Sequence, residues 1–154
     1  MATDPAQAWL SWLQTSSAAA SFRAVVYGGI VEAGVVDTDQ LRAWALARQT
    51  AGTTTKILCC SIQDAGDEPL GEYELLGSVL VRFFDLQYGY TNIRNARDVF
   101  KALWAAQGET LSLDNGGLVD LAYAGRTGHR RASEFGADYE VMTYTARIMV
   151  HEGE

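Results

Sequence analysis

The residues that could do chemistry in this 154-residue chain are few and scattered. Neither His129 nor His151 belongs to a metal-ligand spacing, so the sequence predicts no metal site. Cys59 and Cys60 lie in an apolar stretch, where a thiol stays protonated and unreactive. The glycine-containing stretch 28–34 lacks the spacing of a nucleotide-binding loop. We therefore expect no catalytic residue and no cofactor, and a protein that is not an enzyme.

Two charged segments remain as candidate functional sites. The acidic one contains Asp64, Asp67 and Glu68, and no Lys or Arg occurs between Ile57 and Val81. The basic one consists of Arg126, His129, Arg130 and Arg131. Complementary patches at different places on one subunit favour head-to-tail contacts between copies, and such contacts close into rings. Two alternatives stay open: both segments are solvated loops, or the arginines contact DNA phosphates.

Composition bounds the class of protein. The chain is 48% hydrophobic and 20% charged with two prolines, which predicts a folded domain spanning residues 1–154. Its net charge of −7 argues against a general nucleic-acid binder. The longest weakly polar run, 24–36, is broken by Glu32 and is too short to span a bilayer, so no membrane contact is expected. A disulfide between the adjacent cysteines would be strained, and two free thiols fit a reducing compartment.

The first 50 residues predict a helical segment. Asp4-Pro5 is a helix start, and apolar residues at helical spacing predict a helix over about 5–20. Residues 21–36 are ambiguous, because a strand-like alternation is interrupted by glycines. Asp37 or Thr38 begins a second helix that ends near Gly52.

The rest of the chain, about 53–152, predicts a sheet-plus-helix core. Strands are expected over 53–62 and 73–85 with an acidic loop over 63–71 between them, and a helix over 92–104 stops at Gly108. Strands over 109–113 and 118–124 flank a tight turn at 114–117, and a loop over 125–136 precedes a final strand over 139–150. This order predicts an α+β domain: a mostly antiparallel four- to five-stranded sheet with helices packed on one face.

Three segments in this order carry a family resemblance. They are the strand Val79-Leu80-Val81-Arg82-Phe83-Phe84-Asp85, the helix that opens Asn92-Ile93-Arg94-Asn95-Ala96-Arg97-Asp98-Val99 and ends Ala102-Leu103-Trp104, and the closing strand Tyr139 to Val150. Over residues 54–152 the pattern resembles the tail terminator (tail completion, head–tail joining) proteins of long-tailed bacteriophages.

The resemblance implies a homo-oligomeric ring, expected to be a hexamer, that caps the tail tube in the virion after assembly in the host cytoplasm. It implies contacts with the tail tube protein and with a head-completion or neck protein, and DNA that passes through the lumen without specific binding. A head-completion or neck protein, or another tail component, is a near alternative. A more distant one is a small cytoplasmic ligand-binding domain or enzyme with a pocket between helix and sheet, lined by Trp9, Trp12, Trp44 or Trp104.

Overall fold

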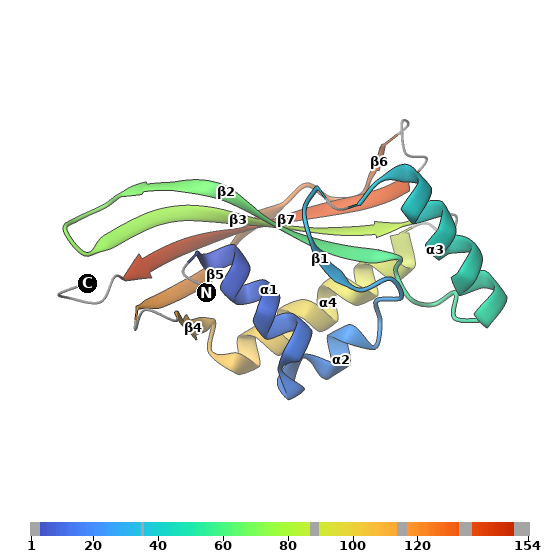
Figure 1. Cartoon of the computed structure of the whole chain (residues 1–154), viewed down its shortest axis with the longest axis horizontal. Helices are drawn as coiled ribbons and strands as arrows, with labels where there is room; N and C mark the ends of the chain where they lie inside the picture. Colours follow the sequence, from blue (N-terminus) through green and yellow to red (C-terminus); the bar gives the residue numbers. More distant parts are fainter. Residues whose placement is uncertain (1–3, 35, 87–89, 114–116, 133–136, 150–154) are drawn as a thin grey trace.

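A twisted β-sheet runs along the long axis of the molecule, and helices cover parts of both of its faces (Figure 1). The computed structural model describes residues 4–34, 36–86, 90–113, 117–132 and 137–149. The strands are β1 (Ile30–Glu32), β2 (Cys59–Pro69), β3 (Glu74–Asp85), β4 (Thr110–Ser112), β5 (Leu118–Arg126), β6 (Arg130–Ala132) and β7 (Ala137–Met149). The helices are α1 (Pro5–Thr15), α2 (Ala20–Arg23), α3 (Thr38–Ala51) and α4 (Tyr90–Gln107), with a 3-10 turn over Ser17–Ala19.

The sheet is larger than predicted, and it is mixed. Its order is β1-β2-β3-β7-β5-β4, with β6 paired to β7, which makes seven strands within the described residues. β1 runs parallel to β2, whereas the other pairs are antiparallel. The α+β class is therefore confirmed, and the expected four to five strands were too few. β1 and β6 were missed because each is only three residues long and lies in a segment without a clear alternation, the glycine-interrupted stretch 21–36 and the predicted loop 125–136.

The predicted starts of α1 and α3 are confirmed by their caps, whereas α4 begins at Tyr90, two residues before its predicted start. The Oδ1 atoms of Asp4 and Asp37 accept hydrogen bonds from the backbone N–H groups of Gln7 and Gln40, at 2.7 and 2.8 Å. α3 ends at Ala51 and is capped by Gly52, whose φ of +74° is the left-handed conformation that glycine adopts readily.

The first helix is shorter than predicted, because α1 ends at Thr15. The side chain of Ser16 then accepts a hydrogen bond from the backbone N–H of Ala18 and starts the 3-10 turn. The alternation that resembled a strand in 21–26 belongs instead to α2 and the turn after it, with Phe22 fully buried.

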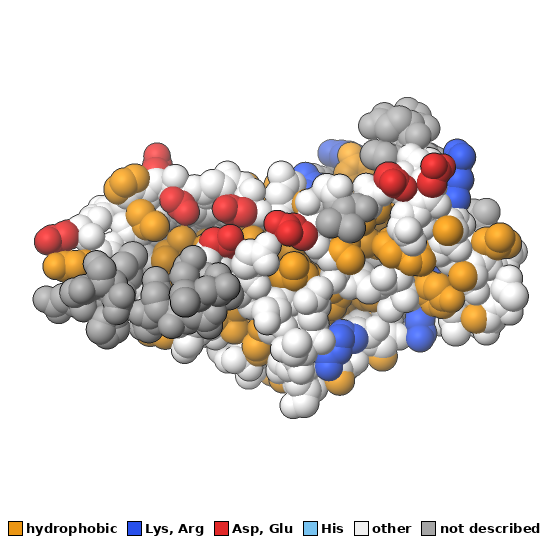
Figure 2. Space-filling view, viewed as in Figure 1, with side chains coloured by type: hydrophobic (Ala, Val, Ile, Leu, Met, Phe, Trp, Pro, Cys, Tyr) orange, Lys and Arg blue, Asp and Glu red, His pale blue; other side chains and the backbone are white. Residues whose placement is uncertain are grey.

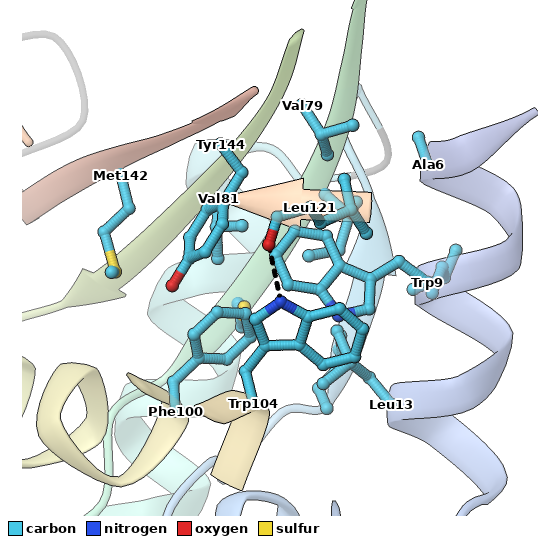
Figure 3. Close-up of a cluster of buried hydrophobic side chains, with 14 of the residues drawn as sticks. Ala6, Trp9, Leu13, Val79, Val81, Phe100, Trp104, Leu121, Met142 and Tyr144 are labelled. Atoms are coloured by element: carbon cyan, nitrogen blue, oxygen red, sulfur yellow. Dashed lines mark hydrogen bonds between the residues drawn. The ribbon is translucent and has the colours of Figure 1, made fainter. Parts of the chain in front are cut away.

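One face of the sheet packs against α1, α2 and α4 around an aromatic cluster (Figure 3). The ring of Trp9 lies 5.0 Å from that of Trp104, 5.3 Å from Phe100 and 4.8 Å from Tyr144. The indole N–H of Trp104 donates a 2.8 Å hydrogen bond to the carbonyl oxygen of Leu121 on β5. The predicted apolar stripe of α4 is confirmed, since each of its members is buried: Ile93, Ala96, Phe100, Leu103 and Trp104.

The opposite face of the sheet carries α3 at one end, which corrects the prediction that helices pack on one face only. The two adjacent cysteines show that both faces of the sheet are covered at this end. Successive side chains of a strand point to opposite faces, so Cys60 joins the main core while Cys59 packs with Leu41 and Ala45 of α3. Both thiols are free and buried, as predicted, and burial raises the pKa of Cys59 to about 12.

A buried polar network fastens α3 to the sheet and to the start of α4. The side chains of Arg48 on α3 and Asp85 at the end of β3 form a fully buried ion pair. Arg48 Nη2 donates to the Leu86 carbonyl oxygen at 3.0 Å, and Asn92 Nδ2 donates to Asp85 Oδ2 at 3.0 Å. The network satisfies the buried charges, which would otherwise be costly.

The acidic loop predicted over 63–71 is mostly strand. β2 extends to Pro69, and the turn is closed by the N–H groups of Leu70 and Gly71, which both donate to the Glu74 carbonyl oxygen. Parts of three other predictions lie outside the described residues: the turn at 114–116, the loop at 133–136, and the end of the last strand with His151.

Candidate assembly surfaces at the two ends of the sheet

The acidic arm, residues 64–73, projects from one end of the sheet (Figure 1). β1 pairs with β2 only over Cys60–Ile62, and the β2–β3 hairpin continues past it with residues 64–73 exposed. The predicted site residues Asp64, Asp67 and Glu68 all lie on this arm. Within the described residues the only ion pair at this end joins Glu74 to Arg147 at 2.9 Å, so the arm keeps its negative charge.

Two glycines shape the acidic arm. A β-bulge lies between Asp64 and Asp67, where Gly66 has φ +94° and donates its N–H to Asp64 Oδ1 at 2.9 Å. Opposite the bulge, a Cβ on Gly77 would clash with the Gly66 carbonyl oxygen and with Asp67. The bulge, the acidic side chains and Pro69 all discourage another strand from pairing with this edge of the sheet.

Large apolar side chains are also exposed at this end. Leu70 and Tyr73 at the tip of the acidic arm are 55% and 43% exposed. Leu118 is 42% exposed, and the sheet register places it two strands across from Glu74. Apolar groups gathered among charged ones are typical of surfaces that bind another protein.

The basic segment, residues 126–131, lies at the other end of the sheet, and most of its charges are paired with two buried carboxylates of β7. Arg126 Nη1 lies 2.6 Å from Glu140 Oε1, and this hydrogen bond raises the pKa of Arg126. Arg131 and His129 approach Asp138 Oδ1 at 2.8 and 3.3 Å. Of the four predicted basic residues, Arg130 alone makes no ion pair within the part of the chain that the structure describes.

Sequence reasoning missed these carboxylates and their second set of partners. Tyr90 donates its hydroxyl hydrogen to Glu140 Oε1 at 2.8 Å, and Arg97 Nη1 donates to the Tyr90 oxygen at 2.6 Å. The His129 ring lies 5.0 Å from that of Tyr90. A signal was present: Asp138 and Glu140 share the alternation of the core-facing residues of β7, so acids at these positions need partners.

A second glycine bulge aims Arg126 at Glu140. The β5–β7 register slips between Tyr123 and Gly125, so Arg126 pairs with Met142 and faces the same side of the sheet as the core. Without the extra residue Arg126 would face the opposite side. Gly125 has φ +146°, a conformation that residues with a Cβ rarely adopt.

The two ends of the molecule thus differ in charge. On the face drawn in Figure 2, acidic side chains follow the β2–β3 hairpin, whereas toward the other end Lys and Arg side chains lie together with a smaller group of acidic ones. The structure does not bring the acidic and basic predicted residues together within one chain, because they lie at opposite ends of the same sheet.

The proposed tryptophan-lined pocket is filled by side chains. Trp9 and Trp104 are buried in the core, and Trp12 meets Trp104 edge to face with ring centroids 5.2 Å apart. Trp44 is partly buried against the core cluster under α3. The described residues contain no group of three or more His, Cys, Asp or Glu side chains placed to hold a metal ion. Among these residues, no helix has the length and apolarity needed to cross a membrane.

Together the fold and its surfaces define an α+β protein whose two ends differ in charge. A search against protein families finds no match to the chain, and a search of curated proteins finds none either. Among solved structures, a chain from "Virion of native gene transfer agent (GTA) particle" is similar, with a TM-score of 0.43 and 15% identity. The match covers 72% of this chain and 90% of that chain.

Proposed function

We propose that this chain is a structural protein of a bacteriophage virion, and more narrowly a tail terminator that forms a ring on the end of the tail tube. In this proposal the ring, a hexamer by the family resemblance, stops growth of the tube and joins it to a head-completion or neck protein. No residue is catalytic.

The observation that carries the proposal is the difference in charge between the two ends of one sheet. Within the described residues the acids of the acidic arm make no ion pair, and in the basic segment Arg130 makes none. The acidic arm and the basic segment are different surfaces, so contact between them is head-to-tail rather than symmetric. Repeating such a contact around an axis gives a ring when the rotation closes. The backbone that holds the two surfaces is continuous, because β3 and β7 pair along twelve residues from one end to the other.

Two further properties support the proposal. The three segments that resemble the tail terminator family are adjacent in space, since β3 pairs with β7 and α4 packs on both. The net charge of −7 also suits a ring around DNA, because a negative lumen lets the polyanion pass without binding.

The direct test is negative-stain imaging and mass measurement of the purified protein, alone and with the tail tube protein of the same phage. Rings that bind to tube ends are the expected result. A monodisperse monomer that ignores the tube protein would contradict the proposal.

A charge reversal tests the head-to-tail contact itself. Arg130→Glu is the informative change, because Arg131 is paired to the buried Asp138 and its reversal would also disturb the fold. We expect Arg130→Glu to lower ring yield, whereas Lys101→Glu, on the exposed face of α4, is the matched control and leaves ring yield unchanged. Equal ring yield from both variants would show that the charge of Arg130 does not contribute to the contact between subunits.

A further inference from the structure

The apolar tip of the acidic arm has a matching surface elsewhere on the same chain. The tip presents Leu70 and Tyr73, which a turn closed by two backbone hydrogen bonds holds at the end of the hairpin. Exposed apolar side chains that are fixed by a short turn lose little entropy when they become buried, which suits an anchor.

The matching surface is a pocket between the flank of α3 and Leu86, just after the end of β3. It has a volume of about 290 Å³ and is lined by Arg42, Ala45, Leu46, Gln49 and Leu86. Leu46 is 67% exposed, the most exposed large apolar residue among the described residues, and it stands on a helix that buries Leu41, Ala45 and Arg48. Arg42 makes no ion pair within the described residues and stands one helical turn from Leu46.

The tip cannot reach this pocket in its own chain. The tip precedes the first residue of β3, and Leu86 follows the last one. The twelve residues of β3 extend about 40 Å, because a strand rises about 3.3 Å per residue. The two surfaces therefore lie at opposite ends of the molecule, as Figure 1 shows for the β2–β3 hairpin and α3. Only a second copy can bring them together.

We propose that Leu70 and Tyr73 of one copy insert into the Arg42–Leu46–Leu86 pocket of the next copy. The charges agree with this occupant, since Glu68 and Glu72 flank the tip and Arg42 lines the pocket. Apolar anchors at the centre with opposite charges at the rim are the usual anatomy of a protein interface. This inference rests on the proposed ring and names the contact that closes it.

Two surface variants test the contact from both sides. The tip variant is Leu70→Ser/Tyr73→Ser, and the pocket variant is Leu46→Asp. Each replaces exposed side chains, so the melting temperature should stay near that of the wild type. We expect each variant alone to associate about 30-fold or more weakly than wild type, the range for loss of an interface anchor. Ala47→Asp adds the same charge one residue away from the pocket lining and is the matched control, with unchanged association.

Mixing the two variants gives the decisive result, read by analytical ultracentrifugation. A tip variant still has a good pocket and a pocket variant still has a good tip, so a 1:1 mixture should form heterodimers that grow no further. A mixture that remains monomeric would show that the tip binds some other surface. Rings that persist in both single variants would overturn this contact while leaving the ring proposal intact. A wild-type protein that is monomeric at every concentration would overturn both.

Discussion

At the scale of single residues, the main polar contacts inside this molecule are made by three fully buried carboxylates. Asp85, Asp138 and Glu140 each face arginine or histidine from another element. Burial raises the pKa of Asp85, and the hydrogen bonds from Arg48 and Asn92 oppose that rise. Each pair ties a helix or a hairpin to the end of β3 or β7 and so holds the fold together.

Loss of Arg48 should be costly because it leaves Asp85 buried without its cation. We expect Arg48→Met to lower the free energy of unfolding by about 3–5 kcal/mol, measured by urea denaturation. Arg147→Met removes a pair whose side chains are partly exposed, so it should cost about 1 kcal/mol or less. Similar losses in the two variants would show that burial does not control the contribution of the pair.

At the scale of elements, glycine bulges decide where the charged side chains point. β2 and β5 each contain one extra residue relative to their neighbour, and each bulge has a glycine with positive φ. The first bulge shapes the acidic arm, and the second turns Arg126 toward Glu140. The proposed surfaces therefore depend on backbone conformation as much as on charged residues.

Gly125→Ala should strain the β5 bulge and weaken the Arg126–Glu140 contact. We expect a loss of more than 1 kcal/mol and faster amide hydrogen exchange at the end of β5, because alanine is disfavoured at φ +146°. Gly71→Ala is the matched change, since a Cβ there meets open space and its φ is not positive. Its stability should be unchanged or rise by about 0.4–1 kcal/mol. An equal loss in both would argue against strain at the bulge.

At the scale of the whole molecule, we expect two kinds of contact between copies: contacts between charges, which salt screens, and an apolar contact, which it does not. The acids of the arm and Arg130 of the basic segment are exposed charges. Salt weakens their attraction as the Debye length falls from about 10 Å at 0.1 M to about 3 Å at 1 M. The tip–pocket contact is apolar and should persist. We therefore expect self-association, measured by sedimentation, to weaken with salt to a plateau rather than disappear.

The Leu46→Asp variant separates the two contributions to that salt dependence. Its remaining association should rest on charge alone and vanish at high salt. Wild-type association that is independent of salt would show that the charged ends play no part in assembly.

The sequence by itself determined the long elements and their inner faces. Helix caps at Asp4 and Asp37, the stripe of α4 and the alternation of β7 follow from local periodicity and local hydrogen bonding, which a single sequence displays. The charged candidate residues were also readable, because they occur in runs.

Tertiary structure decided how those residues are used. The pairing of Arg126 and Arg131 with carboxylates of β7, the placement of α3 on the second face, and the short strands β1 and β6 all depend on how separate elements pack against one another. Such contacts depend on register and on bulges, and a slip of one residue reverses every side chain. For the same reason, only the folded sheet shows that the apolar tip of the acidic arm and the α3 pocket lie at opposite ends of β3, about 40 Å apart.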